Sequence, residues 1–135
     1  MIEAKIRMMV HPRQIEISEE LVLAIYNESI DCDIVTEDLI ISIIFYESSF
    51  NQFAVSSVDC VGYMQIHWRI HGLDRYTMLN NISANIQEGC RIIRENYYRF
   101  DGDWQMILNA YNGWASYNNT YANRVLNRKQ NLRSM

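Results

Sequence analysis

The sequence lacks the features that mark membrane-spanning, repetitive and disordered proteins. Its 135 residues include one proline and five glycines, with no internal repeat or low-complexity segment. No apolar run approaches the roughly 20 residues that a membrane span requires. The first residues, MIEAKIRMMVHPRQIEISEE, carry scattered charges and no continuous apolar core, so we expect no secretory signal there. Because 49% of the residues are hydrophobic and 21% are charged, we expect a single folded domain over residues 1–135.

An excess of positive charge is also missing. The formal net charge is −4, which argues against nucleic acid as the main partner, because phosphate binding relies on concentrated positive charge. Four basic residues do gather near the C-terminal end: Arg124, Arg128, Lys129 and Arg133. Basic side chains in the last turns of a helix interact favourably with its dipole, so we interpret this group as a solvated helix end.

Cysteine is scarce, and the three residues show none of the close Cys-x-x-Cys spacings of zinc sites. The three residues are Cys32, Cys60 and Cys90. Two states remain open for them: one disulfide with a free thiol, or three reduced and mostly buried thiols. His67 and His71 have a spacing found in metal sites on helices, but Gly72 and the lack of a nearby acidic partner argue against a metal ion there.

Two segments lack helical periodicity. Residues 1–17 contain Pro12 and form no recognisable element, so this N-terminal segment is expected to be poorly defined. Residues 51–73 alternate aromatic and β-branched residues loosely with polar ones, which predicts a small β-hairpin or an irregular cleft wall. Gly62 and Gly72 are the positions there best suited to backbone conformations closed to other residues.

The remaining segments have helical patterns preceded by residues that can cap helices. Ser18 precedes a helix that is expected to stop near residues 31–33 and to bury Leu21, Val22, Ile25 and Tyr26. Thr36 and Asp103 precede two more helices, and a last helix is expected to hold Tyr117, Tyr121 and Val125. A long helix from about Ile82 contains Gly89, which we expect to pack closely against another backbone. The pattern predicts a mainly α domain of five or six helices.

The helix after Thr36 ends with a carboxylic acid on its apolar side. Its hydrophobic residues recur at three- and four-residue spacing and predict one buried face: Leu39, Ile40, Ile43 and Ile44. Glu47 lies four residues after Ile43, on the same face. Burial raises the pKa of a glutamate towards that of a general acid working near neutral pH. Glu47 is therefore a candidate catalytic acid, and the alternative is a helix-terminal glutamate turned towards water.

Several further sequence blocks follow Glu47 in order. They read ESSFN at 47–51, AVSS at 54–57, GYMQI at 62–66, Asn85-Ile86 with Gly89, and AYNG at 110–113. This order resembles the lytic transglycosylase domain, a relative of goose-type lysozyme. The signature of that family is a Glu-Ser pair, Ala-Val-Ser, Gly-Leu-Met-Gln, Asn-(Ile/Leu)-x-x-Gly and Ala-Tyr-Asn. The blocks span residues 36 to about 126, and the resemblance implies a lysozyme-like α-helical domain.

The resemblance implies cleavage of peptidoglycan between N-acetylmuramic acid (MurNAc) and N-acetylglucosamine (GlcNAc). The β-1,4 bond would be cleaved without water, leaving a 1,6-anhydro-MurNAc end, with Glu47 as general acid and then base. No metal and no cofactor are implied. The supporting or substrate-binding candidates are Ser56, Gln65, Tyr111, Asn112, Met64 and Tyr63.

Each supporting candidate also has an alternative. Ser56 could hydrogen-bond Glu47 or the acetamido group of the substrate, and Gln65 could bind substrate or fix the cleft wall. The Tyr111 hydroxyl could orient Glu47, although the spacing alone predicts a core aromatic. Asn112 could equally be a helix C-cap, given the glycine beside it, and Met64 is expected to pack, forming the floor of a sugar subsite. The aromatic residues near the motifs that could stack on sugars are Tyr63, Trp68 and Trp114.

Departures from the family pattern leave other activities open. Tyr63 replaces leucine, Asp59-Cys60 replaces a Gly-Ala pair, and Gly113-Trp114 stands where Ala-Gly is usual. Asp59 is interpreted as a solvated loop residue, but as a second carboxylate it would make the chain a hydrolytic muramidase. A glycan-binding module without catalysis is the remaining alternative.

The expected partner is the glycan strand of peptidoglycan, bound by a monomer without nucleic acid. Such a substrate implies action on the cell wall, in the periplasm or outside the cell. Without a visible secretory signal, a bacteriophage lysis or virion protein is the preferred source of such a chain.

Overall fold

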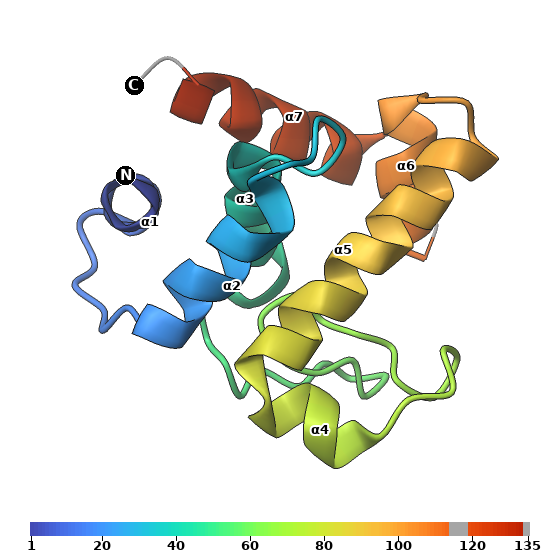
Figure 1. The fold of residues 1–135 in the computed structure, drawn as a ribbon, viewed down its shortest axis with the longest axis horizontal. Helices are drawn as coiled ribbons and strands as arrows, with labels where there is room; N and C mark the ends of the chain where they lie inside the picture. Colours follow the sequence, from blue (N-terminus) through green and yellow to red (C-terminus); the bar gives the residue numbers. More distant parts are fainter. Residues whose placement is uncertain (114–118, 134–135) are drawn as a thin grey trace.

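The computed structural model describes residues 1–113 and 119–133, which form seven helices and no β-strand. The helices are α1 (Ile2–Val10), α2 (Glu19–Ser29), α3 (Glu37–Ser48), α4 (Arg75–Asn80), α5 (Ile82–Arg99), α6 (Trp104–Tyr111) and α7 (Thr120–Arg133). Figure 1 shows α5 as a long diagonal helix, with α7 crossing one end of α3 and with α4 beside the irregular segment. The prediction of a mainly α fold is confirmed.

Helix α3 is the central element, and it packs against α1, α2 and α7. The Thr36 hydroxyl accepts a hydrogen bond from the backbone N–H of Leu39, as the capping prediction required. The predicted apolar face is buried, but Ile41 and Ser42 are fully buried as well. The Ser42 hydroxyl donates to the backbone carbonyl of Asp38 at 2.8 Å, which satisfies it inside the core. Helix α3 is therefore buried from water on more sides than its single predicted apolar face would indicate.

The expectation of a poorly defined N-terminal segment is wrong for residues 2–10. They form α1, which packs against α2 and α3 and buries Ile2, Ile6, Met9 and Val10. Lys5 also ties α1 to α3, since its ammonium lies 2.7 Å from Asp38 and 3.1 Å from Glu37. The helix ends two residues before Pro12, which cannot donate a helical hydrogen bond. Nine residues give too few apolar repeats to reveal this helix without its tertiary partners.

Most other helix predictions agree with the structure, with three exceptions. Ser18 and Asp103 cap α2 and α6 as expected, but Tyr26 of α2 is 48% exposed. The short helix α4 was not predicted, since its six residues hold too little of a periodic pattern. The basic end of α7 is more than a solvated surface, because Arg128 donates to the Tyr46 hydroxyl at 3.1 Å. Tyr117 lies outside the described residues.

The segment 51–73 is an irregular wall, which was one of its two predicted forms. It contains only isolated antiparallel bridges, Val55 with Val61 and Val61 with Ile66. Gly62 and Gly72 have φ values of +82° and +65°, as predicted for conformations that disfavour other residues. An irregular segment makes few repeating backbone hydrogen bonds, so side chains from the helices must hold it in place.

Asn85 of α5 holds this wall. It is 2% exposed, and its Oδ1 accepts from the N–H of Met64 at 3.0 Å while its Nδ2 donates to the carbonyls of Val61 and Met78. One turn later, Gly89 leaves room for the Met64 side chain, which a Cβ at this position would meet. Gly89 thus packs closely as predicted, but against a side chain instead of a backbone.

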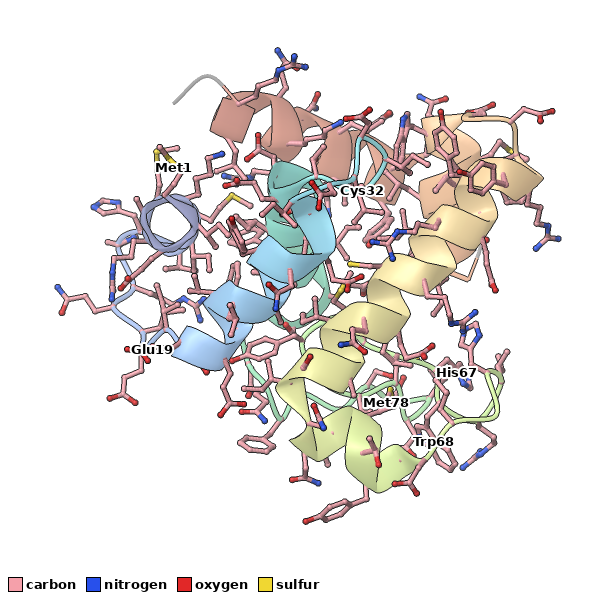
Figure 2. All side chains as sticks on the ribbon, in the orientation of Figure 1. Met1, Glu19, Cys32, His67, Trp68 and Met78 are labelled. Atoms are coloured by element: carbon pink, nitrogen blue, oxygen red, sulfur yellow. The ribbon has the colours of Figure 1, made fainter. Side chains whose placement is uncertain are left out.

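The three cysteines are free thiols in the structure, with Cys90 buried and Cys32 and Cys60 partly buried. Figure 2 shows Cys32 after the end of α2, on the side of α5. Of the two states left open by the sequence, the structure has the reduced one. No helix within the described ranges, 1–113 and 119–133, is both long and apolar enough to cross a membrane.

Replacing Asn85 with alanine would remove three hydrogen bonds from buried backbone groups. We expect Asn85→Ala to lower the free energy of unfolding by roughly 3 kcal/mol, because unpaired buried groups keep their desolvation cost. Urea denaturation followed by circular dichroism measures the change. The control is Asn80→Ala, since Asn80 is exposed and only donates within α4. Equal losses in the two variants would contradict the assigned role of Asn85.

Candidate active site

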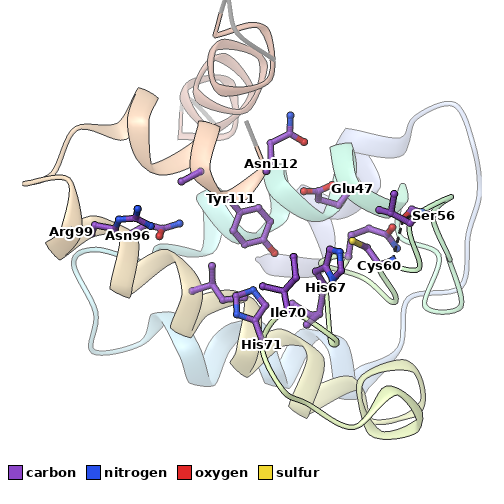
Figure 3. A pocket seen from close by; sticks show the side chains of 16 residues that line it. Glu47, Ser56, Cys60, His67, Ile70, His71, Asn96, Arg99, Tyr111 and Asn112 are labelled. Atoms are coloured by element: carbon purple, nitrogen blue, oxygen red, sulfur yellow. Dashed lines mark hydrogen bonds between the residues drawn. The ribbon is translucent and has the colours of Figure 1, made fainter. Parts of the chain in front are cut away.

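A cavity of about 680 Å³ opens between the end of α3, the irregular wall, α5 and the end of α6. Glu47, in the last turn of α3, lines it. In the view of Figure 3, Glu47 and Ser56 lie on one side of Tyr111, while Asn96 and Arg99 of α5 lie on the other. A cavity of this volume falls in the range of small-molecule binding sites.

Burial raises the pKa of Glu47 from its ordinary value of 4.5 to about 7. The Tyr121 hydroxyl of α7 donates to Glu47 Oε2 at 3.0 Å, and this hydrogen bond acts in the opposite direction because it stabilises the ionised form. Glu47 is therefore a cavity-lining carboxyl with a raised pKa, and its role as a catalytic acid stays a prediction. A carboxyl with this pKa can both donate and accept a proton near neutral pH.

The tyrosine hydrogen-bonded to Glu47 is Tyr121, and the suggestion that the Tyr111 hydroxyl would orient Glu47 is wrong. The Tyr111 hydroxyl donates to the carbonyl of Met64 at 2.6 Å, although the Tyr111 ring does line the cavity. Burial raises the pKa of both phenols well above the ordinary value, so both stay protonated donors. The spacing of Tyr121 and Val125 did predict a helix, but the partner of the Tyr121 hydroxyl depends on how α7 crosses α3.

Ser56 and Gln65 line the cavity, and their polar groups hold the wall itself. Ser56 Oγ accepts from the backbone N–H groups of Val58 and Cys60, the second of which is drawn in Figure 3. Gln65 Nε2 donates to the carbonyls of Ala54 and Gly62, each at 3.0 Å. Of the alternatives weighed for Gln65, the structure has the one in which it fixes the cleft wall.

The other three supporting candidates are divided between the cavity and the core. Asn112 lines the cavity and is also the C-cap of α6, which was its predicted alternative. Met64 is fully buried, so the expected packing is confirmed, but it is absent from the described cavity lining and does not form the floor of a subsite there. Tyr63 is 6% exposed and lines a second cavity, between the wall and residues 7–18, so it cannot stack on a sugar beside Glu47.

Asp59 is a partly exposed loop residue, as expected, but it is ion-paired within the wall and does not line the cavity. Its two oxygens accept from Arg75 at 2.9 and 3.0 Å, and Oδ2 also accepts from the indole of Trp68 at 3.0 Å. The Arg75 guanidinium holds the pKa of Asp59 below its ordinary value. The indole N–H of Trp68 is therefore bound to a carboxylate of the wall itself. Trp114, the other tryptophan considered for stacking, lies outside the described residues.

Two histidines and an arginine line the cavity beyond the predicted motifs: His67, His71 and Arg99. No group of three histidine, cysteine or acidic side chains within the described part of the chain could hold a metal ion. Glu47 is the one carboxyl among the described residues that line the cavity, and residues 114–118 and 134–135 contain no acidic residue. Acid–base chemistry at a carboxyl in this cavity therefore rests on a single group.

Together, the fold and the cavity define a mainly α domain with one shielded carboxyl at the end of its central helix. A family model described as the transglycosylase SLT domain matches residues 24–133. The chain therefore belongs to the transglycosylase SLT family, whose architecture is lysozyme-like and mainly α, and this membership implies peptidoglycan of the cell wall as the substrate. No curated protein and no solved structure matches the chain significantly.

Removing the Tyr121 hydroxyl should raise the pKa of Glu47 further. The hydroxyl favours the ionised carboxylate, so Tyr121→Phe is expected to move the pKa upwards from about 7 by about one unit. A carbon NMR titration of the Glu47 carboxyl measures the change. Tyr111→Phe is the matched control, since its hydroxyl donates to Met64. A shift no larger in Tyr121→Phe than in this control would contradict the assignment.

Proposed function

We propose that the chain is a peptidoglycan lytic transglycosylase with Glu47 as its catalytic residue. It cleaves the β-1,4 bond between MurNAc and GlcNAc and leaves a 1,6-anhydro-MurNAc end. The observation that carries this proposal is the Glu47 carboxyl, which lines the cavity with a pKa raised by burial to about 7. Membership of the SLT family supports the substrate class.

In the proposed reaction, protonated Glu47 donates its proton to the glycosidic oxygen, and the bond from MurNAc C1 to that oxygen breaks. The N-acetyl group of the substrate stabilises the positive charge that develops at C1. Ionised Glu47 then takes the proton of the MurNAc C6 hydroxyl, and the oxygen of this hydroxyl forms the new bond to C1. The carboxyl ends protonated, as it began, and no water is consumed. One group can perform both steps because its pKa is close to the working pH.

The lining of the cavity favours this route over hydrolysis. Hydrolytic glycosidases generally need two carboxyl groups, one acid and one nucleophile or base. Here Asp59 is held by Arg75 and Trp68, and it is absent from the described lining that contains Glu47. An intramolecular hydroxyl replaces the activated water, so the second carboxyl is not needed.

The supporting roles follow from the same contacts. Ser56 and Gln65 keep the wall beside Glu47 in shape, and their remaining polar surface faces the substrate. Tyr121 orients the carboxyl in both protonation states, since a phenol can donate to the carboxylate and accept from the acid. Action as a monomer and an origin in a bacteriophage remain predictions.

Glu47→Gln should abolish turnover and leave glycan binding in place, because the amide keeps the shape but cannot transfer the proton. We expect at least a hundredfold loss, of the order that general acid–base catalysis contributes. Mass spectrometry of fragments released from purified peptidoglycan measures both the rate and the product. Asp59→Asn is the comparison, and it should retain the reaction in the fraction that folds. Products with a reducing MurNAc end would instead mean that water is the acceptor and that the chain is a muramidase.

The pH dependence should follow the protonated form of Glu47. Below about pH 7 the carboxyl carries the proton that the first step requires, so kcat/KM should be at its plateau. Above that pH it should fall tenfold for each further unit as the acid is lost. The descending limb is recorded with soluble glycan strands in buffers of constant ionic strength. In Tyr121→Phe the limb should move to higher pH, and an unchanged limb would assign it to another group.

A further inference from the structure

The part of the cavity beyond Tyr111 has a charge that the cleavage reaction does not use. Arg99, in the last turn of α5, lines the cavity together with Asn96 of the same helix. Figure 3 shows both side chains on the opposite side of Tyr111 from Glu47. Asn96 is 8% exposed and donates to the Ile107 carbonyl, which fixes this end of the cavity to α6.

Arg99 has no acidic partner within the described part of the chain. Its guanidinium lies over the ring of the adjacent Phe100, 5.0 Å from the ring centre, and it takes part in none of the ion pairs there. The other arginines of α5 are neutralised, Arg91 by Glu88 and Glu95 and Arg94 by Glu28. An unpaired guanidinium in the cavity of a protein of net charge −4 indicates complementarity to an anion.

The lining offers this anion no competitor near Arg99. Glu47 is the one acidic side chain of the described lining, and its pKa of about 7 leaves it about half ionised at neutral pH and largely uncharged below it. His71 also lines the cavity, and burial followed by the nearby Arg91 lowers its pKa, so it is mostly a neutral hydrogen-bonding group. Arg99 therefore supplies the fixed positive charge of the cavity at neutral pH.

We propose that the Arg99 end of the cavity binds a carboxylate of the peptide that peptidoglycan carries on its MurNAc residues. This inference rests on the proposed function, and it adds the part of the substrate that the enzyme selects. The peptide is attached through the lactyl group at C3 of MurNAc, so it extends away from the bond that Glu47 cleaves. A guanidinium can bind a carboxylate through two parallel hydrogen bonds, which gives orientation as well as attraction. Arg99 is thus a specificity-determining residue.

The test compares three soluble, uncross-linked glycan strands. The first carries peptides with free carboxylates, the second carries the same peptides with their carboxylates converted to methylamides, and the third has been stripped of its peptides. Stripping leaves a lactyl carboxylate on MurNAc, so the third strand separates this source of the anion from the peptide. Release of anhydro-MurNAc products gives kcat/KM for each strand.

Wild type should process the first strand about five- to tenfold more efficiently than the second, mainly through KM, as expected for one partly exposed charge-assisted contact. Arg99→Gln should remove this preference and leave the second strand unaffected, and added salt should reduce the preference in wild type. The matched control is Arg69→Gln, because Arg69 is also exposed, lies over the adjacent Trp68 ring and is absent from the cavity lining.

An equal loss on all three strands, or no loss on the first, would overturn the role of Arg99. If Arg99→Gln affects the stripped strand as much as the first, the peptide is not the source of the carboxylate and the inference is wrong. Failure of the proposed function is a different result, in which wild type releases no product from any strand. In that case, equilibrium binding of the three strands to wild type and Arg99→Gln decides the carboxylate assignment alone.

Discussion

The burial of α3 is the constraint on which the candidate site depends. This helix carries carboxyl groups at both ends, and the two ends are compensated differently. Asp38, in the first turn, is 9% exposed and has the Lys5 ammonium at 2.7 Å. Glu47, in the last turn, accepts from the uncharged hydroxyl of Tyr121 and has no ion-pair partner among the described residues. Arg128 of the packed helix α7 donates to the Tyr46 hydroxyl instead. Because the desolvation at Glu47 meets no opposite charge, its neutral form is favoured up to about pH 7. The helix thus has a stabilising ion pair at one end, whereas at the other end the uncompensated desolvation of Glu47 raises its pKa.

The irregular wall depends on a second, smaller set of contacts. Asn85 and Gly89 are four residues apart and therefore share one face of α5. Asn85 binds the backbone of the wall, and Gly89 accepts the Met64 side chain. The carbonyl of Met64 in turn accepts from Tyr111 at the end of α6. A segment without strands is in this way fixed to two helices, both of which contact Met64, and the hydrogen bond from Tyr111 to Met64 sets the position of the Tyr111 ring in the cavity. The block with Asn85 and Gly89 and the block with Tyr111, which are far apart in the sequence, thus contact the same segment of the wall.

Much of the fold could be predicted because its signals are local. The caps Ser18, Thr36 and Asp103 are each read from one residue and the apolar repeat that follows it. The position of Glu47 on the buried side of α3 follows from the same repeat. Helices α1 and α4 were not predicted, because their nine and six residues contain too few apolar repeats to be distinguished from the flanking sequence. The errors within the site all concern partners distant in sequence. Tyr111 and Tyr121 lie on helical faces as predicted, but which hydroxyl reaches Glu47 depends on the crossing of α3 and α7. Asp59 pairs with Arg75, which lies sixteen residues further along the chain.

The placement of charge around the cavity satisfies two requirements that oppose each other. Binding an anionic substrate needs a cation, whereas a carboxyl that must stay protonated near neutral pH cannot have a cation beside it, since an adjacent guanidinium would lower its pKa. The structure meets both requirements by separation. Burial and the Tyr121 hydroxyl determine the pKa of Glu47, and no guanidinium acts on it. Arg75 is neutralised by Asp59 within the wall, and Arg99 lies beyond Tyr111. Moving either guanidinium next to Glu47 would strengthen the attraction of the site for anions and at the same time remove the proton with which the proposed reaction begins.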